Sequence, residues 1–382
     1  MSGRPVQRRG VEVTAQSMES GGGARRSARA GFQPPGFGEP GGRCPASHDE
    51  KMRPRGRCGG SRVIGTALLL IALAGGGCVV HLDQSDVGIR AESKAVSFLS
   101  REVPAWSRDN HCFSCHNNGD GARALYIADQ KGHRIPARDL KETTAWLARP
   151  DRWEKNKGDP GFSDQRLANI QFATSLLAAT ESSHVRGRGK LKEAARKVAA
   201  DQSADGSWPV DAGNAVGSPA TYGTTLATFM AWRVLRSADA PGTAEAVRKA
   251  GKWLRQSPTT TVLAAATSIL ALAHDGTEPV RNQRQECLDL LRRAQTHDGG
   301  WGPYADSPPE AFDTAVALLA LAEMRETTGV KEMMQQGRNF LLALQQPDGG
   351  WPATTRTPGG QSYAQRISTT SWATLALLAT RE

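Results

Sequence analysis

Two cysteines and a histidine form the densest chemical motif of the chain. Cys112, Cys115 and His116 make a Cys-x-x-Cys-His pattern. Thiols at this spacing can add to the two vinyl groups of haem, and the adjacent imidazole can bind its iron. The pattern therefore predicts a c-type haem held by Cys112, Cys115 and His116, with His133 as the candidate second ligand of the iron.

Other interpretations of this motif stay open. A Cys112–Cys115 disulfide is compatible with an oxidising compartment. A thioredoxin-like dithiol would need a βαβ context, and a zinc site would need a second ligand pair, and the sequence offers neither. For the second iron ligand, no Met lies between Met52 and Met230, and His81 is an alternative to His133. His133 also fits a solvated loop histidine, and a five-coordinate iron is a further alternative.

The N-terminal part has the composition of an export signal preceded by an unstructured stretch. Residues 1–51 are rich in Gly, Arg, Pro and Ser, and are expected to be disordered or an extension ahead of a true start at Met52. Four arginines then precede a 12-residue apolar run over 63–74, which is too short to span a bilayer. We assign 52–77 as a signal peptide and expect the protein to be exported to the periplasm or cell envelope.

Cys78 follows three glycines at the end of this signal and is a candidate for lipidation. It resembles the acylated cysteine of bacterial lipoproteins, although Gly75 stands where that motif has an aliphatic residue. Cleavage after Ala74, at an Ala-x-Ala site, would instead give a soluble exported protein. A lipid anchor at Cys78 is the only membrane attachment that we expect.

The positive charge of the chain is concentrated near the N-terminus. Residues 1–62 hold 12 of the 48 Lys and Arg residues but only 5 of the 38 Asp and Glu residues. The remaining chain is close to neutral, so no nucleic-acid partner is expected.

Three nearly identical loops indicate an internal repeat in the second half of the chain. Each reads Gln-x-x-Asp-Gly-Gly-Trp, or the same with Ser for the second Gly, between two helical patterns. We expect Gly to allow a left-handed turn, Asp to accept backbone hydrogen bonds, and Trp to anchor neighbouring hairpins. The loops are thus interpreted as structural rather than catalytic. Their repeated residues are Gln202, Asp205 and Trp208 in the first loop, Gln295, Asp298 and Trp301 in the second, and Gln345, Asp348 and Trp351 in the third.

Apolar and amphipathic helices alternate between these loops. Because one hairpin cannot bury both faces of its apolar helix, neighbouring hairpins must stack. The apolar helices are predicted over 167–179, 224–235, 262–273, 313–324 and 370–378, and the amphipathic ones over 189–201, 243–256, 280–295 and 331–345. The stretch 139–147 is a candidate outer partner for the first apolar helix.

The loops and the apolar helices resemble the repeat of the squalene/hopene cyclases and protein prenyltransferase β subunits. The resemblance covers roughly 165–382 and implies an all-α fold, an α/α toroid of about five helical hairpins around a central cavity. We place a small cytochrome-c-like, haem-binding segment at 78–164, ahead of the toroid.

The resemblance supports a cyclase activity only in part, because the motif that holds the catalytic acid is incompletely matched. In hopene cyclases the proton donor is the central Asp of Asp-x-Asp-Asp-Thr-Ala, and the matching segment here is Glu310-Ala-Phe312-Asp313-Thr-Ala. Phe312 replaces the donor, which leaves Glu310 and Asp313 as candidate acids, and Asp313 is also a candidate N-cap of a helix beginning at Thr314. Zinc binding of the prenyltransferase type is not expected, because Cys287 lacks a matching His.

Three functions follow as hypotheses. The first is an exported haem-c protein whose toroid couples redox chemistry to an apolar, isoprenoid or protein partner. The second is a non-catalytic envelope scaffold with a Cys112–Cys115 disulfide, and the third is a divergent cyclase-type enzyme. The interior of the toroid is expected to be either an apolar cavity or a closed, packed core. In both cases we expect aromatic side chains to line it, among them Tyr222, Phe229, Phe312, Tyr363 and Trp372.

Overall fold

The computed structural model describes residues 84–156, 164–210, 222–354 and 362–381, which form helices and turns without strands. These residues belong to one compact unit. Within the described ranges, no helix is long and apolar enough to cross a bilayer. The predicted signal peptide, Cys78 and His81 lie outside the described residues.

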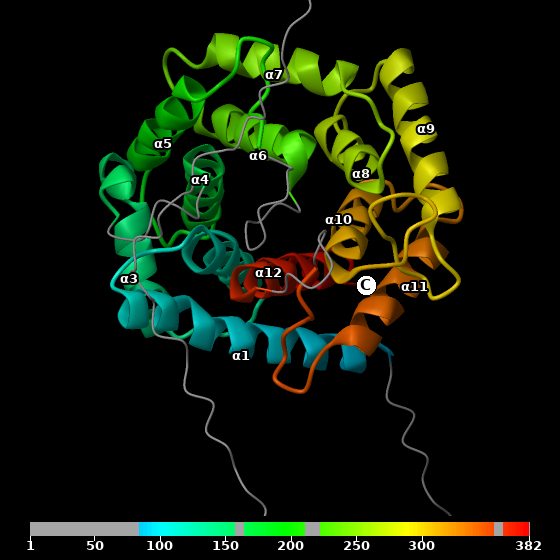
Figure 1. The fold of residues 1–382 in the computed structure, drawn as a ribbon, viewed down its shortest axis with the longest axis horizontal. Helices are drawn as coiled ribbons and strands as arrows, with labels where there is room; N and C mark the ends of the chain where they lie inside the picture. Colours follow the sequence, from blue (N-terminus) through cyan, green and yellow to red (C-terminus); the bar gives the residue numbers. More distant parts are fainter. Residues whose placement is uncertain (1–83, 157–163, 211–221, 355–361, 382) are drawn as a thin grey trace, which may run out of the picture. The chain divides into compact units, whose positions relative to one another are not determined.

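Two concentric rings of helices make up this unit (Figure 1). Each inner element contacts its two inner neighbours, and the last one, α12, contacts the first, so the ring is closed. The first inner element is a π-helix, η1, that continues into α2. The inner elements are η1 (Cys115–Gly121) with α2 (Ala122–Gln130), α4 (Gln165–Glu181), α6 (Gly223–Ala238), α8 (Val262–Ala271), α10 (Ala311–Ala322) and α12 (Tyr363–Ala379).

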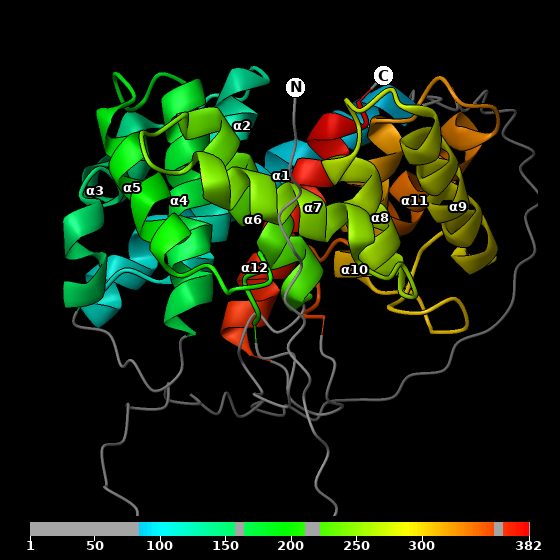
Figure 2. The ribbon, with the colours of Figure 1, turned by 90° about the horizontal axis from the view of Figure 1, so that it is seen from above.

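The outer ring consists of more polar, amphipathic helices (Figure 1). The chain alternates strictly between outer and inner elements, so the inner helices all run in the same direction. Their C-terminal ends therefore gather at one face of the ring, which Figure 2 shows edge-on. The outer helices are α1 (Gln84–Asn110), α3 (Ala137–Leu147), α5 (Gly189–Ala200), α7 (Ala244–Gln256), α9 (Glu278–Ala294) and α11 (Val330–Leu344), and a 3₁₀ turn, η2 (Pro150–Lys155), follows α3.

The predicted α/α toroid is confirmed, but the ring of described residues has six inner elements rather than about five. The sixth is η1 with α2, and its outer neighbours are α1 and α3. Residues 84–155 therefore form part of the toroid wall instead of a cytochrome-like unit ahead of it. The polar start of this inner element, Cys-His-Asn-Asn-Gly-Asp-Gly, hides its helical character in the sequence.

The tryptophan of each repeated loop is fully buried, and both its indole N–H and its backbone N–H donate hydrogen bonds. The indole nitrogens of Trp208, Trp301 and Trp351 donate to carbonyls ten residues earlier, at 2.7–2.8 Å. Their backbone N–H groups donate to threonine hydroxyls on the following inner helix, at 2.9–3.1 Å. Each Trp therefore joins the outer helix before it to the inner helix after it.

The glutamine of each loop joins one outer helix to the next. Gln202 Nε2 donates to Ala246 O on α7, at 2.9 Å, and Gln295 Nε2 donates to Met333 O on α11, at 3.0 Å. Gln345 Nε2 reaches Ala91 O on α1, at 2.9 Å. The third loop thus closes the outer ring onto the helix that begins the described chain.

The ring closure also requires a glycine at position 349. Gly349 has a φ of 98°, and a Cβ atom there would lie 2.3 Å from Lys94 O of α1. The equivalent glycines at 206 and 299 have the same sign of φ and a similar approach to the next outer helix. The loop carboxylates of Asp205 and Asp348 accept backbone N–H bonds from two residues later, both at 3.0 Å.

Candidate functional site

The Cys-x-x-Cys-His motif begins the first inner element. Ser114 Oγ accepts a hydrogen bond from Asn117 N and caps η1. The Asn117 amide donates to Glu102 O at 2.7 Å, and the Asn118 amide donates to Thr143 Oγ1 at 2.8 Å. These bonds fix the π-helix against α1 and α3, and π-helical turns are frequent at functional sites.

The donor set of the motif fits a haem, whereas the packing around it is tight. Cys112 and Cys115 are free thiols rather than a disulfide. His116 is buried, burial lowers its pKa to about 3, and its Nε2 atom has no hydrogen-bond partner in the described structure. The imidazole packs edge-on against Trp106 and Tyr363, with ring centres 4.7 and 5.8 Å away. A haem beside His116 would require these two aromatic rings to turn aside.

His133 cannot share an iron with His116. His116 lies in the first turn of η1 and His133 in the turn that follows α2, so at least the length of α2, about 13 Å, separates them along the element. His133 Nε2 instead contacts Glu92 Oε2 at 3.0 Å and the Arg381 guanidinium at 2.9 Å. Nor does any group of three or more His, Cys, Asp or Glu side chains in the described ranges offer a metal site.

The segment that matches the cyclase acid motif lies at the start of α10. The helix begins at Ala311 with Glu310 as its N-cap residue, so the predicted N-cap role of Asp313 is wrong. Asp313 is fully buried in the first turn, where the positive end of the helix dipole favours a carboxylate. Phe312 is also fully buried and packs among Tyr222 and Trp372, with ring centres 6.5 and 5.7 Å away.

A different carboxylate, Asp120 of η1, is buried among the inner elements. It is 1% exposed and accepts hydrogen bonds from side chains of α4, α12 and the N-cap residue of α6. Burial raises the pKa of Asp120, and these bonds together with the nearby Arg123 guanidinium oppose that rise. The donors are Tyr222 Oη at 2.8 Å, Gln171 Nε2 at 2.9 Å and Ser368 Oγ at 2.9 Å.

Arg123 connects this buried carboxylate to a cavity. It is 3% exposed, its Nη2 atom lies 3.7 Å from Asp120 Oδ1, and its Cζ atom lies 4.2 Å from the centre of the Trp372 ring. Arg123 and Trp372 both line a cavity of about 760 Å³, whereas Asp120 does not. The pair therefore separates the carboxylate from the open part of the ring interior.

This central cavity opens at the C-terminal ends of the inner helices. Its walls come from α2, α6, α8, α10 and α12. The apolar lining includes Ile127, Phe229, Leu319 and Leu375. Arg123 and Trp372 form the floor, about two turns before the ends of their helices. The space suits an elongated apolar molecule.

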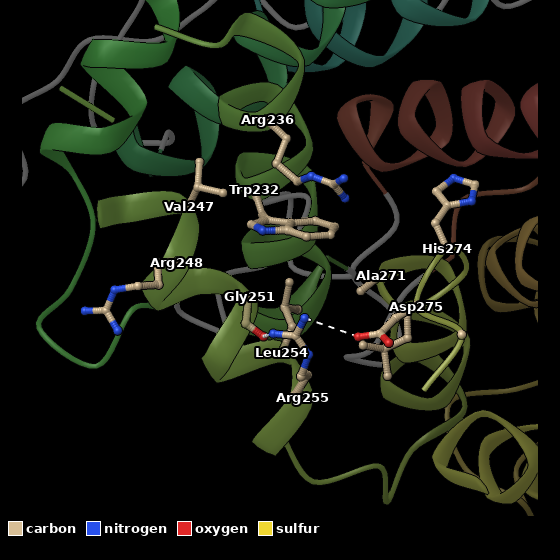
Figure 3. Close-up of a pocket in the computed structure, with 12 residues that line it drawn as sticks. Trp232, Arg236, Val247, Arg248, Gly251, Leu254, Arg255, Ala271, His274 and Asp275 are labelled. Carbon is tan, nitrogen blue, oxygen red and sulfur yellow. Dashed lines mark hydrogen bonds and ion pairs between the residues drawn. The ribbon is translucent and has the colours of Figure 1, made fainter. Parts of the chain in front are cut away.

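A second cavity of about 440 Å³ adjoins the central one between α6, α7 and the α8–α9 link (Figure 3). Trp232 and Arg236 line both cavities. Figure 3 shows the Arg236 guanidinium beside the Trp232 ring, at 4.5 Å from the ring centre, and the Arg255–Asp275 ion pair on the far side. The Trp232–Arg236 pair is thus a shared wall.

The predicted site residues fall at separate places in the ring. Tyr222, Phe312 and Trp372 form one aromatic cluster, while Phe229 lines the cavity and Tyr363 is 41% exposed near His116. Asp120 and Arg123 were missed. Asp120 was hidden in turn-like sequence, but a lone Arg in the apolar run Ala-Arg-Ala-Leu-Tyr-Ile was a usable signal.

Comparison with known proteins agrees with this geometry. The family model of the squalene-hopene cyclase C-terminal domain matches residues 256–382. Lanosterol synthase erg7A of Aspergillus fumigatus is 28% identical over 106 residues, which are 26% of this chain and 14% of that enzyme. The chain therefore spans only a small part of this relative.

Similar solved structures extend the likeness to most of the ring. A variant of the type II terpene cyclase MstE from Scytonema, in complex with geranylgeranyl dihydroxybenzoate, has a TM-score of 0.52 at 14% identity, over 78% of this chain and 98% of that one. A protein from Actinoplanes has a TM-score of 0.53 at 17% identity, over 77% and 100%.

The same fold also occurs outside the terpene cyclases. A possible member of the GH105 family from Salmonella enterica serovar Paratyphi A has a TM-score of 0.50 at 11% identity, over 78% of this chain and 95% of that one. Likeness at these identities establishes the fold rather than the reaction. The chain is an α/α toroid with the fold of the terpene cyclases.

Proposed function

We propose that this protein binds an apolar, isoprenoid-like molecule inside the toroid, in the central cavity between α2, α6, α8, α10 and α12. The observation that carries the proposal is the cavity itself, about 760 Å³ with apolar side chains below its mouth. Ligand sites of roughly 300–1,000 Å³ enclose most of a drug-sized molecule. The substrate named for the Scytonema cyclase contains a geranylgeranyl chain, which supports an isoprenoid as the ligand class.

Binding is favoured over cyclisation by the position of the acids. Cyclisation by protonation needs an acid in contact with the apolar chain. Phe312 replaces the donor of the cyclase motif, and Asp120, Glu310 and Asp313 are not among the residues that line the central cavity. The one carboxylate in its lining, Glu323, is exposed to solvent and so has no buried site that would make it a strong acid. If the protein were nevertheless a divergent cyclase, incubation with squalene would give cyclic products, and Asp313→Asn would abolish them.

A cavity-filling variant tests the binding proposal. We expect purified protein to bind geranylgeraniol and Ala379→Trp to weaken this binding at least tenfold, because Ala379 lines the cavity at the end of α12 and an indole ring there would obstruct its mouth. Thr328→Trp, an exposed substitution on the α10–α11 link, is the matched control and should bind as the wild type does. Equal binding by Ala379→Trp and the wild type would refute the proposed site.

We also propose a cellular location for this protein. The arginine-flanked apolar run ahead of Cys78 supports export to the periplasm or cell envelope, with a lipid anchor on Cys78 as an option. The intact mass of protein purified from membranes and from the periplasm tests both parts. A mature N-terminus upstream of residue 63 would exclude cleavage of this signal.

We propose a c-type haem as a second candidate function, because His116 Nε2 is buried without a partner beside two free thiols. Cys112 and Cys115 would hold the haem and His116 would bind its iron, which would add electron-transfer or ligand-binding chemistry to the toroid. Protein expressed with a haem-attachment system should carry one haem per chain and give a pyridine haemochrome spectrum. Cys112→Ala/Cys115→Ala should carry none, and an unmodified wild-type mass would reject this candidate.

A further inference from the structure

We propose that His133 is part of a pH-sensitive latch at the rim of the central cavity, in which the neutral imidazole holds Arg381 against α1 and the protonated imidazole releases it. The latch consists of Glu92 of α1, His133 in the turn after α2, and Arg381, which follows α12. It acts on the rim alone, whichever molecule the cavity binds.

One nitrogen of His133 lies between two groups that make opposite demands on it. The Nε2 atom is 3.0 Å from Glu92 Oε2 and 2.9 Å from Arg381 Nη2. An ionised carboxylate can only accept a hydrogen bond, whereas a guanidinium can only donate one. Nε2 therefore bonds to Arg381 only when it carries no proton, and to Glu92 only when it carries one.

The buried charge of Glu92 needs a cation, and two cations are within reach. Glu92 is fully buried, and its Oε1 atom has no hydrogen-bond partner in the described structure. Its charge therefore depends on the contacts at Oε2, where Arg381 is bonded as well. A protonated His133 can replace Arg381 as the counter-ion, and two adjacent cations repel each other. Arg381 is the more exposed of the two, at 32% of its side chain against 11%, so Arg381 is the one released to solvent.

No other charged side chain in the described ranges contacts the His133 ring. The remaining charged groups on the same turn, on α1 near Glu92, at the ends of α2 and α3 and beside the end of α12 are exposed or paired elsewhere. They are Arg90, Lys94, Asp129, Lys131, Arg134, Arg138, Asp139, Arg325 and Arg338. Protonation of His133 therefore acts first on Glu92 and Arg381.

Release of Arg381 frees the turn between α2 and α3. Arg381 Nη1 donates to Lys131 O at 3.1 Å, and Lys131 lines the central cavity. The hydroxyl of Thr380 stays bonded to Arg338 Nη1, at 2.8 Å, so α12 itself remains in place. The turn over 131–136 is thus the part of the rim that acidification loosens.

Hydrogen exchange of this turn, corrected for the intrinsic effect of pH, tests the latch. We expect protection of 131–136 to fall about tenfold between about pH 8 and about pH 5, because a charge-assisted hydrogen bond is lost where histidine becomes charged. His133→Phe leaves Arg381 on Glu92 throughout and should abolish this change, whereas His133→Lys should be weakly protected at both pH values. His274→Phe, at an exposed histidine of the α8–α9 link, is the matched control and should respond as the wild type does. An acid response that persists in His133→Phe would assign it to another group and overturn the inference.

Nitrogen NMR of histidine-labelled wild-type protein gives a second readout that needs no variant. At about pH 8 the His133 ring should carry its proton on Nδ1, because Nε2 accepts from Arg381. On acidification both ring nitrogens should become protonated, together with the loss of protection in the turn. A proton on Nε2 at high pH would show that the ring binds Glu92 throughout, and the latch would be rejected.

Discussion

Arg123 stacks on Trp372, with 4.2 Å between the guanidinium carbon and the centre of the indole ring, and this pair closes the floor of the central cavity. Behind the pair lies Asp120, the buried carboxylate to which three inner elements donate hydrogen bonds. The interior of the ring is therefore divided into a polar, packed layer and an open, apolar layer. This division underlies the predictions below.

Removing the charge of Arg123 should destabilise the ring. We expect Arg123→Gln to lower the free energy of unfolding by about 3 kcal/mol, because it leaves Asp120 without its cation and Trp372 without its stacking partner. The measurement is urea unfolding followed by circular dichroism. The double variant Arg123→Gln/Asp120→Asn should recover part of this loss in the free energy of unfolding. If the losses of the two single variants simply added in the double variant, the two groups would not be coupled.

The pH dependence of stability should report Asp120. Its pKa is raised by burial in the folded chain, so the folded state binds this proton more tightly than the unfolded state does. Relative to Asp120→Asn, the wild type should therefore lose stability as pH rises from about 4, near the unfolded pKa of Asp, through the higher folded pKa. Urea unfolding of both proteins at a series of pH values from about 4 upward tests this. A wild-type advantage that grows with pH would contradict the prediction.

The closing contact of the ring should not tolerate a side chain at position 349. Gly349→Ala forces a Cβ atom against Lys94 O in addition to a left-handed φ, whereas Gly329→Ala meets only the left-handed φ of 78°, in open space. We expect a loss of about 1 kcal/mol for Gly329→Ala and a clearly larger loss for Gly349→Ala, measured by thermal and urea unfolding. Equal losses would mean that α1 does not pack on this loop.

The C-terminus should be held by a buried acid. Glu92 of α1 is fully buried and contacts both His133 and Arg381. Arg381→Ala should lower the free energy of unfolding by about 2 kcal/mol, because Glu92 loses its permanent cation, whereas Arg381→Lys should recover much of it. Hydrogen exchange of the last turn of α12 gives a second readout, and unchanged protection in Arg381→Ala would argue against this contact.

The repeated loops predicted the fold because their residues act locally and in a fixed order. Gly and Trp at set spacings predicted stacked hairpins, and apolar helices such as 262–271 appear directly in the sequence. That the Gln of each loop joins one outer helix to the next became visible only in the structure. The polar start of η1 concealed the sixth inner element. Likewise, the first turns of α12 contain Gln365, Arg366 and Ser368, so that helix begins seven residues before the predicted start at Thr370.

The cavity could not be predicted in the same way. Its cations come from α2, α6 and the segment after α10, which are far apart in the sequence and meet only because all inner helices point in one direction. The hydrogen-bond donors of Asp120 come from up to 248 positions away in the chain. Such long-range convergence leaves no local pattern, whereas the Cys-x-x-Cys-His motif stood out because it is short.

The most direct measurement of the central claim is photo-crosslinking with a geranylgeraniol analogue that carries a benzophenone at the end of its chain. Peptide mass spectrometry of the adducts locates the apolar chain. We predict adducts on α2, α6 and α12, near Ile127, Phe229 and Leu375, with competition by unlabelled geranylgeraniol and loss in Ala379→Trp. Adducts confined to the outer helices, or unchanged in Ala379→Trp, would contradict the account.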